Sequence, residues 1–125
     1  MLNLHVEKFN DIDIISLEGI FDINNLARVE SVWLEQTILK PRMIAINCAG
    51  LEAVDSSAIG TIVKLFNYSM NMGIMPVLYD LSPLLRRLFM TAKLNRCVTI
   101  ATRSEFENHI ALKFAPLPIQ FSHQR

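Results

Sequence analysis

A carboxylate and two hydroxyls stand side by side at Asp55, Ser56 and Ser57, between an apolar run that ends at Cys48 and an amphipathic run that begins at Ile59. This pattern predicts a strand followed by a helix, with the three polar side chains at the helix N-terminus. Backbone amides point outward without partners there, and the helix dipole is positive, so negative charge is favoured. A phosphoserine, with about −1.5 to −2 charges at neutral pH, would be tolerated at this position. The residues therefore fit a phosphorylation site, and they also fit simple helix caps, because Asp and Ser are favoured at that position.

Nucleophilic catalysis by these serines is not supported. A hydrolase nucleophile elbow requires glycines two residues on either side of the serine. Val54 and Ala58 occupy those positions around Ser56, and Asp55 and Ile59 occupy them around Ser57. The three histidines fall in an early strand, the last helix and the tail, so none supplies a base, and no His or Cys spacing fits a zinc site. We therefore expect a protein that is not an enzyme and that holds no cofactor or metal.

The composition predicts a single soluble domain. The chain has 125 residues, 51% of them hydrophobic, and its twelve basic and twelve acidic side chains cancel, which argues against nucleic acid as a partner. No apolar run approaches the ~18 residues of a membrane span, and no signal peptide is evident, so we expect a cytoplasmic protein without membrane contact. Basic residues predominate after residue 81. They predict either charges interleaved by folding or a basic patch near Arg86, Arg87, Lys93 and Arg96.

Hydrophobic periodicity places the elements that position the polar side chains. Five strands are predicted, over residues 2–7, 12–17, 42–48, 75–81 and 97–100. Gly19 is expected to break the second strand. Four main helices are predicted, over residues 23–39 after an Asp22 cap, 59–72 before Gly73, from Pro83 after a Ser82 cap, and from a capping box at Ser104 to about Phe114.

The apolar spacing also predicts which side of each helix is buried. In the helix over residues 59–72, the expected buried side carries Ile59, Ile62, Val63, Phe66 and Met70, and the expected polar side carries Thr61, Lys64, Asn67 and Asn71. A helical wheel drawn from Ile59 places Ser56 nearer the apolar side than Ser57. The helix after Ser82 is expected to bury Leu84, Leu85, Leu88 and Phe89. Glu30 falls inside the apolar arc of the first helix and has no explanation from the sequence.

Strands that alternate with helices imply an α/β fold with a mixed, mostly parallel sheet and right-handed crossovers. Functional sites of such sheets lie beyond the carboxyl ends of the strands. The order of elements therefore gathers five polar side chains toward one rim: Asp22, Asp55, Ser56, Ser57 and Ser82.

Four segments in register resemble one family. Residues 55–60 (Asp-Ser-Ser-Ala-Ile-Gly) look like the Asp-Ser-Ser/Ala-Gly-Leu-Gly signature of STAS domains, specifically the bacterial anti-sigma factor antagonists. Residues 19–22 (Gly-Ile-Phe-Asp) are similar to the family's Gly-Glu-Leu-Asp turn, and Met72-Gly73 precedes the fourth strand as in the family. Residues 81–89 resemble its Ser-Pro-x-Val-x-Arg-Leu-Phe segment. Ala58 stands where glycine is common, and Ile20 where an acidic residue is common.

The resemblance implies a β-α superhelix over residues 1–114, followed by a C-terminal tail over residues 115–125. It also implies phosphorylation of the first serine after the aspartate, which is Ser56, with Ser57 as the reserve. The implied partners are a serine kinase that is also an anti-sigma factor and a PP2C-type phosphatase. The partner-binding residues carried over are Asp22, Asp55, Ser56, Ser57, Ala58 and Ser82. The alternative is a STAS interaction or scaffold subunit of another complex without a phosphoswitch.

Overall fold

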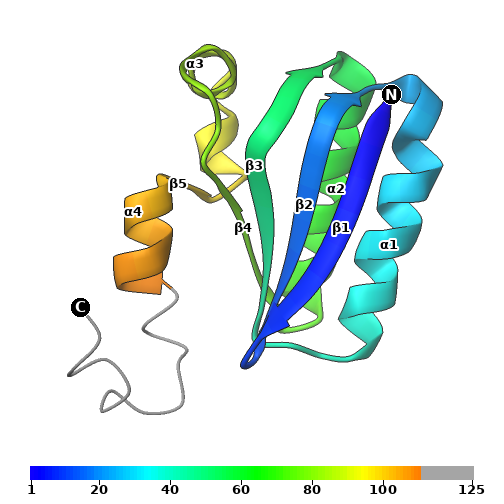
Figure 1. The fold of residues 1–125 in the computed structure, drawn as a ribbon, viewed down its shortest axis with the longest axis vertical. Coiled ribbons are helices and arrows are strands. Elements are labelled where there is room, and N and C mark those ends of the chain that lie inside the picture. Colours follow the sequence, from blue (N-terminus) through cyan, green and yellow to red (C-terminus); the bar gives the residue numbers. More distant parts are fainter. Residues whose placement is uncertain (111–125) are drawn as a thin grey trace.

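The computed structural model describes residues 1–110, which form a mixed sheet with helices on both of its faces (Figure 1). The predicted end of the last helix at Phe114, the domain boundary that follows it and the tail lie outside these residues. Within residues 1–110 the sheet has five strands: β1 (Leu2–Phe9), β2 (Ile12–Phe21), β3 (Met43–Val54), β4 (Met75–Tyr79) and β5 (Ile100–Ala101). Their order in the sheet equals their order in the chain, β1-β2-β3-β4-β5. Only β1 and β2 are antiparallel, so the predicted mixed, mostly parallel five-stranded sheet is confirmed.

The strands β2 and β3 are longer than their apolar runs. The prediction that Gly19 ends β2 is wrong, because β2 continues to Phe21 through register shifts against β3 on both sides of this glycine. Gly19 has φ +113°, and a Cβ at this position would lie 2.2 Å from the carbonyl oxygen of Met1. The predicted end of β3 at Cys48 is also wrong, since β3 pairs with β2 as far as Val54.

The helices begin at the side chains that the sequence indicates, with one exception. Asp22 caps a 3₁₀ turn, η1 (Ile23–Asn25), which continues into α1 (Leu26–Ile38). The helices α2 (Ser56–Asn71) and α3 (Pro83–Thr91) follow caps at Asp55 and Ser82. A 3₁₀ turn, η2 (Leu94–Arg96), precedes β5, so the prediction of a strand from Cys97 begins too early.

The exception is the last helix. Its capping box joins Thr102 to Glu105 rather than starting at Ser104. It opens α4 (Arg103–Glu105), which continues as a π-helical turn, η3 (Phe106–Ile110). The box is therefore two residues earlier than predicted, because Thr102 with Glu105 satisfies the same spacing rule as Ser104 with Glu107.

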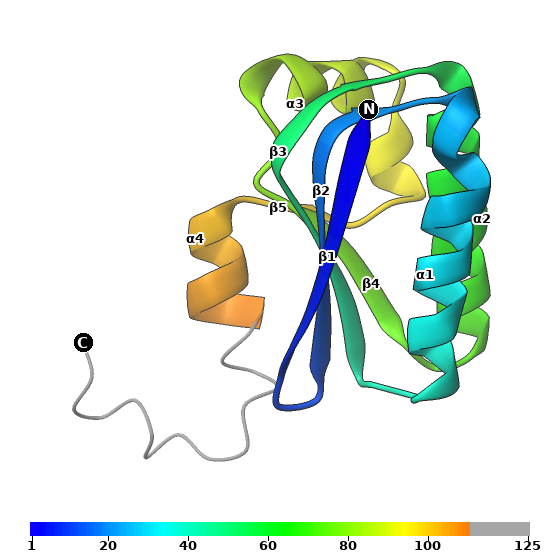
Figure 2. The same cartoon turned by 45° about the vertical axis from the view of Figure 1, so that its right-hand side comes forward.

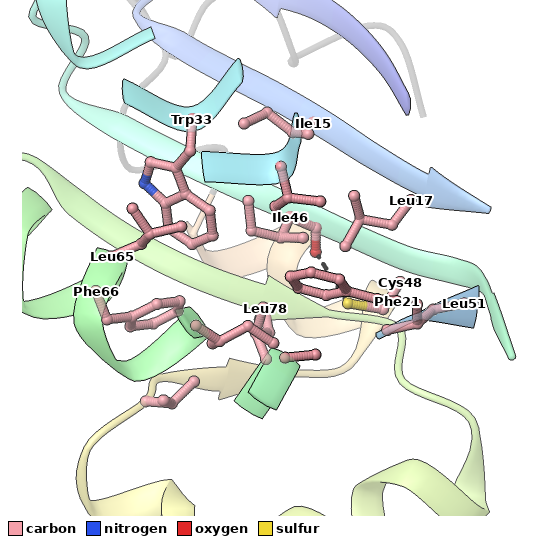
Figure 3. Close-up of a cluster of buried hydrophobic side chains, with 14 of the residues drawn as sticks. Ile15, Leu17, Phe21, Trp33, Ile46, Cys48, Leu51, Leu65, Phe66 and Leu78 are labelled. Atoms are coloured by element: carbon pink, nitrogen blue, oxygen red, sulfur yellow. Dashed lines mark hydrogen bonds between the residues drawn. The ribbon is translucent and has the colours of Figure 1, made fainter. Parts of the chain in front are cut away.

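The helices α1 and α2 cover one face of the sheet, and the main core lies between them and the strands (Figures 1 and 2). Figure 3 shows this core around the Trp33 and Phe66 rings, which meet edge to face at 5.7 Å. The indole N–H of Trp33 donates to the hydroxyl of Ser69 at 2.9 Å, so both polar groups are satisfied inside the core.

A smaller cluster covers the opposite face, where α4 docks. The rings of Tyr79 and Phe106 stack with centroids 4.0 Å apart, and the guanidinium of Arg103 lies over the Tyr79 ring. Arg103 Nε also donates to Asp80 at 2.7 Å, and this hydrogen bond raises the pKa of Arg103. Along residues 1–110, no helix has the length and apolar character needed to cross a membrane.

Two predicted helix faces need correction. In α2 the buried residues are Ala58, Thr61, Ile62, Leu65, Phe66 and Ser69, whereas Met70 is exposed. Thr61 was expected on the polar side. In α3 only Leu85 and Phe89 are buried, while Leu84 and Leu88 are 69% and 41% exposed. Glu30, which the sequence leaves unexplained, forms an ion pair with Lys64 of α2 and so links α1 to α2.

Candidate functional site

Asp55 holds the start of α2 against the start of the α1 segment. Its Oδ1 accepts a hydrogen bond from the amide of Ala58 at 2.8 Å, as expected of a helix cap. Its Oδ2 accepts a second one from the amide of Ile23 at 3.0 Å. The backbone amide of Asp55 donates to the carbonyl of Phe21 at 3.3 Å. The sequence predicts the first contact and gives no signal for the second, because Ile23 and Asp55 belong to different elements.

Ser56 and Ser57 differ in exposure. Ser56 is the first residue of α2 and is exposed, whereas Ser57 is half-buried. This order is the reverse of the helical-wheel expectation, because the buried side of α2 begins at Ala58 and Thr61 rather than at Ile59. As the first residues of the helix, both serines have amides without an acceptor one turn back. An anion on the Ser56 side chain would therefore lie in solvent beside free donors.

Ala58 does not contribute a methyl group to the surface. The residue is fully buried within the main core, so its side chain points away from any protein that approaches Ser56. The substitution of alanine for the family's common glycine therefore changes the core side of α2 and not its exposed side.

Asp22 belongs to the same end of the molecule as Asp55. Its Oδ1 accepts from the amide of Asn24 at 3.0 Å, and the side chain of Asn25 accepts from the amide of Asp22 in return. Ile23, which follows Asp22 and donates to Asp55, has a side chain that is 64% exposed. Ile20 is also exposed, so two apolar side chains accompany the two carboxylates on this surface.

Ser82 belongs to another element and is engaged there. Its hydroxyl accepts from the amide of Leu85 at 3.2 Å and so caps α3. The strand β4 ends at Tyr79, opposite Asn47, whereas β3 continues to Val54 before Asp55 follows. At about 3.3 Å per residue, the eight residues from Asn47 to Asp55 amount to roughly 26 Å of chain beyond the last paired residue of β4. The structure thus brings Asp22, Asp55, Ser56 and Ser57 together and leaves Ser82 on α3.

The potential metal ligands of the described residues do not form a metal-binding group. Among residues 1–110, no three His, Cys, Asp or Glu side chains converge in a way that could hold a metal ion. Burial raises the pKa of the Cys48 thiol to about 12, with a further contribution from the charge of Asp80, so this thiol stays protonated at neutral pH. Cys97 is exposed.

The basic residues of the second half of the chain gather around α3. Arg87, Lys93 and Arg96 are exposed, and Arg86 is half-buried. Within the described part of the chain, none of the four forms an ion pair. This favours the basic-patch interpretation over charges interleaved by folding.

Comparison with known proteins agrees with this architecture. The family model of the STAS domain matches residues 3–109. No curated protein matches the chain in sequence. The fold is similar to that of an anti-sigma factor antagonist from Mycobacterium paratuberculosis, at 14% identity, with a TM-score of 0.73 and coverage of 81% of this chain and 86% of that one.

Two further solved structures show the same fold. The Bacillus cell fate determinant SpoIIAA, in its phosphorylated form, has 19% identity and a TM-score of 0.65 and is covered over 99% of its length by 86% of this chain. A sulfate transporter family protein from Wolinella succinogenes has 13% identity and a TM-score of 0.64, with coverage of 73% of this chain and 76% of that one. At these identities the likeness concerns the fold.

Proposed function

The chain belongs to the STAS domain family, and we propose that it is an anti-sigma factor antagonist, a non-enzymatic binding protein that phosphate on Ser56 switches. In this proposal the unphosphorylated protein binds a serine kinase that is also an anti-sigma factor, and thereby frees a sigma factor for transcription. A PP2C-type phosphatase restores the binding form. The fold is similar to that of a protein described as an anti-sigma factor antagonist. It is also similar to that of SpoIIAA in its phosphorylated form. Both similarities support this proposal.

The exposure of Ser56 at the first position of α2 is the observation that carries the proposal. A kinase must reach the hydroxyl, and Ser56 offers it in solvent, whereas Ser57 is half-buried. The fold would also tolerate the product, because the helix dipole and the free amides of the first turn favour a dianion there. Phosphorylation would thus change the charge of the surface without breaking the core.

The change in charge would act on a surface that is already acidic. Asp22 and Asp55 lie beside Ser56, so phosphate would add about two negative charges to two carboxylates. A kinase surface that fits the unphosphorylated state would meet repulsion in the phosphorylated state. The proposed contact surface is therefore formed by Asp22, Asp55, Ser56 and Ser57, with Ile20 and Ile23 as its apolar members. Ala58 supports it from the core, and Ser82 joins it only if the partner extends to α3. In this proposal the protein acts in the cytoplasm.

Incubation with the cognate kinase and ATP, followed by mapping of phosphate by mass spectrometry, tests the proposal. We expect phosphate on Ser56 in the wild type and in Ser57→Ala, and no incorporation in Ser56→Ala. The two variants are matched, since each removes one hydroxyl from the first turn of α2. Phosphate found only outside residues 55–57 would overturn the site.

A STAS interaction subunit without a phosphoswitch is the second candidate. The specific observation in its favour is that both carboxylate oxygens of Asp55 accept hydrogen bonds from backbone amides, those of Ile23 and Ala58. These two bonds give Asp55 a structural role that requires no phosphorylation of the neighbouring serine. This candidate predicts a stable partner that is not a kinase. That partner should bind the wild type and Ser56→Asp with equal affinity.

A further inference from the structure

The strand β1 is an edge of the sheet. It pairs with β2 on one side, and no strand of residues 1–110 lies on its other side. Figure 1 shows β1, in deep blue, as the last strand of the sheet on the side of β2. The strand has eight residues, Leu2–Phe9. A long edge strand presents a row of unpaired backbone groups that can pair with another chain.

The hydrogen bonds at the start of β1 identify which groups face outward. In an antiparallel pair, the amide and carbonyl of one residue point to the same side, and the side alternates along the strand. The carbonyl of Met1 accepts from the amide of Ile20 and therefore faces β2, whereas the carbonyl of Leu2 accepts from Arg28 Nη1 at 2.6 Å. The alternation then leaves three residues with outward amides and carbonyls beyond Leu2, namely Leu4, Val6 and Lys8.

We propose that these three residues pair with the same residues of a second copy of this chain, with the two β1 strands antiparallel about a twofold axis at Val6. In this register Leu4 lies opposite the second copy's Lys8, and Val6 lies opposite the second copy's Val6. All three outward residues are then hydrogen-bonded, with roughly six interchain hydrogen bonds. Other twofold registers leave one of them unpaired or require the carbonyl of Leu2, which Arg28 already occupies.

The side chains of β1 favour the same register. Asn3, His5 and Glu7 lie on the open face of the sheet, and the pairing places His5 opposite the second copy's Glu7, twice by symmetry. Both side chains are free to adapt, since they are 73% and 61% exposed, and within one chain the His5 Nε2 and Glu7 Oε2 atoms already lie 3.8 Å apart. On the other face, the half-buried Leu4 and Val6 gain apolar cover. A twofold contact of this kind is closed, so association ends at the dimer.

Sedimentation velocity of the full chain with charge variants tests the pairing. His5→Glu places a carboxylate opposite the second copy's Glu7, and Glu7→Lys places an ammonium opposite its His5, so each variant alone should raise the dimer dissociation constant about tenfold. An equimolar mixture of the two variants should restore association, because both cross-strand pairs are then of opposite charge. Glu18→Lys is the matched control, since it makes the same charge change on the same face one strand further in, and it should leave the constant unchanged.

Cross-linking tests the register in a Cys97→Ser background. Residues directly opposite each other in a non-hydrogen-bonded pair have Cα atoms about 4.5 Å apart, within reach of a disulfide. We expect a disulfide between a His5→Cys chain and a Glu7→Cys chain, and none between His5→Cys and Asn3→Cys chains. A protein that stays monomeric to millimolar concentration would overturn the proposal and leave the edge for an extended segment of another protein. A dimer that the charge variants do not weaken would overturn it as well, by placing the contact elsewhere.

Discussion

The carboxylate of Asp55 accepts a hydrogen bond from the backbone amide of Ile23 at 3.0 Å, across 32 residues of sequence. With its other oxygen, the same side chain caps α2. One carboxylate thus fixes two helical segments relative to each other at the end of the molecule where Ser56 is exposed. Phosphate on Ser56 would be placed next to this clamp, so the stability of the clamp bears on the proposed switch.

Replacement of Asp55 by alanine should lower the free energy of unfolding by about 2 kcal/mol, because a helix cap and a second charge-assisted hydrogen bond are lost together. Urea denaturation followed by the fluorescence of Trp33 measures the effect. The control is Glu52→Ala, which removes an exposed carboxylate from the end of β3, three residues before Asp55, and should change stability by less than about 0.5 kcal/mol. Equal effects of the two variants would contradict the clamp.

Ser56→Asp should fold with wild-type stability to within about 0.5 kcal/mol, because a carboxylate at the first helical position interacts favourably with the dipole. The same variant should bind the kinase partner at least about tenfold more weakly by calorimetry, because the added charge lies beside Asp22 and Asp55. Ser56→Ala serves as the control and should bind as the wild type does. Equal affinity of Ser56→Asp and Ser56→Ala would contradict the electrostatic mechanism.

Ser69→Ala should cost about 1–3 kcal/mol, because the buried indole N–H of Trp33 loses its acceptor. The double variant Trp33→Phe/Ser69→Ala tests the cause, since removing the donor should make the serine substitution less costly. Thermal unfolding by circular dichroism suits this series, as one member lacks the tryptophan. Additive effects of the two substitutions would show that the hydrogen bond is energetically unimportant.

Two glycines should respond in opposite directions to alanine. Gly19→Ala should destabilise the protein by more than about 1 kcal/mol, because Gly19 has a positive φ and a Cβ would collide with the carbonyl of Met1. Gly60→Ala lies within α2, where nothing approaches within 4 Å of the added carbon, and should stabilise the protein by about 0.5–1 kcal/mol. Chemical denaturation of both variants under one set of conditions makes the comparison. A stabilising Gly19→Ala would contradict the positive φ of Gly19 and its close approach to Met1.

Stability should fall as pH rises above 9. The Cys48 thiol has a pKa of about 12 in the folded protein against 9.0 as its ordinary value, and Tyr79 has about 12 against 10.0, both raised chiefly by burial. The unfolded chain therefore loses these protons first, and the stabilisation present below pH 9 is lost as the pH rises toward 12. Urea midpoints at pH 8, 9.5 and 10.5 should decline, and Cys48→Ala should reduce the slope between the first two. A flat profile in the wild type would contradict the burial of both groups.

The helix N-caps can be predicted from the sequence because they depend only on residues close together in the chain. Asp22, Asp55 and Ser82 each accept from an amide two or three residues later, so the signal lies within one turn of chain. The sequence also predicts the order of elements and the mixed sheet, since strands and helices alternate with clear periodicity. What it could not predict depends on partners that are distant in sequence.

The buried face of α2 illustrates the difference. Ser69 can be buried because the indole N–H of Trp33, 36 residues earlier, donates a hydrogen bond to its hydroxyl. No local sequence pattern predicts a hydrogen bond between residues so far apart. The helical wheel therefore predicts Met70 on the buried side of α2 in place of Ser69. For the same reason it predicts the exposures of Ser56 and Ser57 in the wrong order. In the same way, β3 continues through the polar Glu52 because β2 supplies a ladder beside it as far as Phe21.

The identity of sheet order and chain order, β1-β2-β3-β4-β5, also bears on how the protein is made. Each strand that leaves the ribosome finds its neighbour already synthesised, and none must wait for a strand that has yet to emerge. The sheet can therefore grow in the direction of translation, with contacts of short sequence separation that favour rapid folding. Within residues 1–110, the strand made first is also the one whose outer edge no later strand covers.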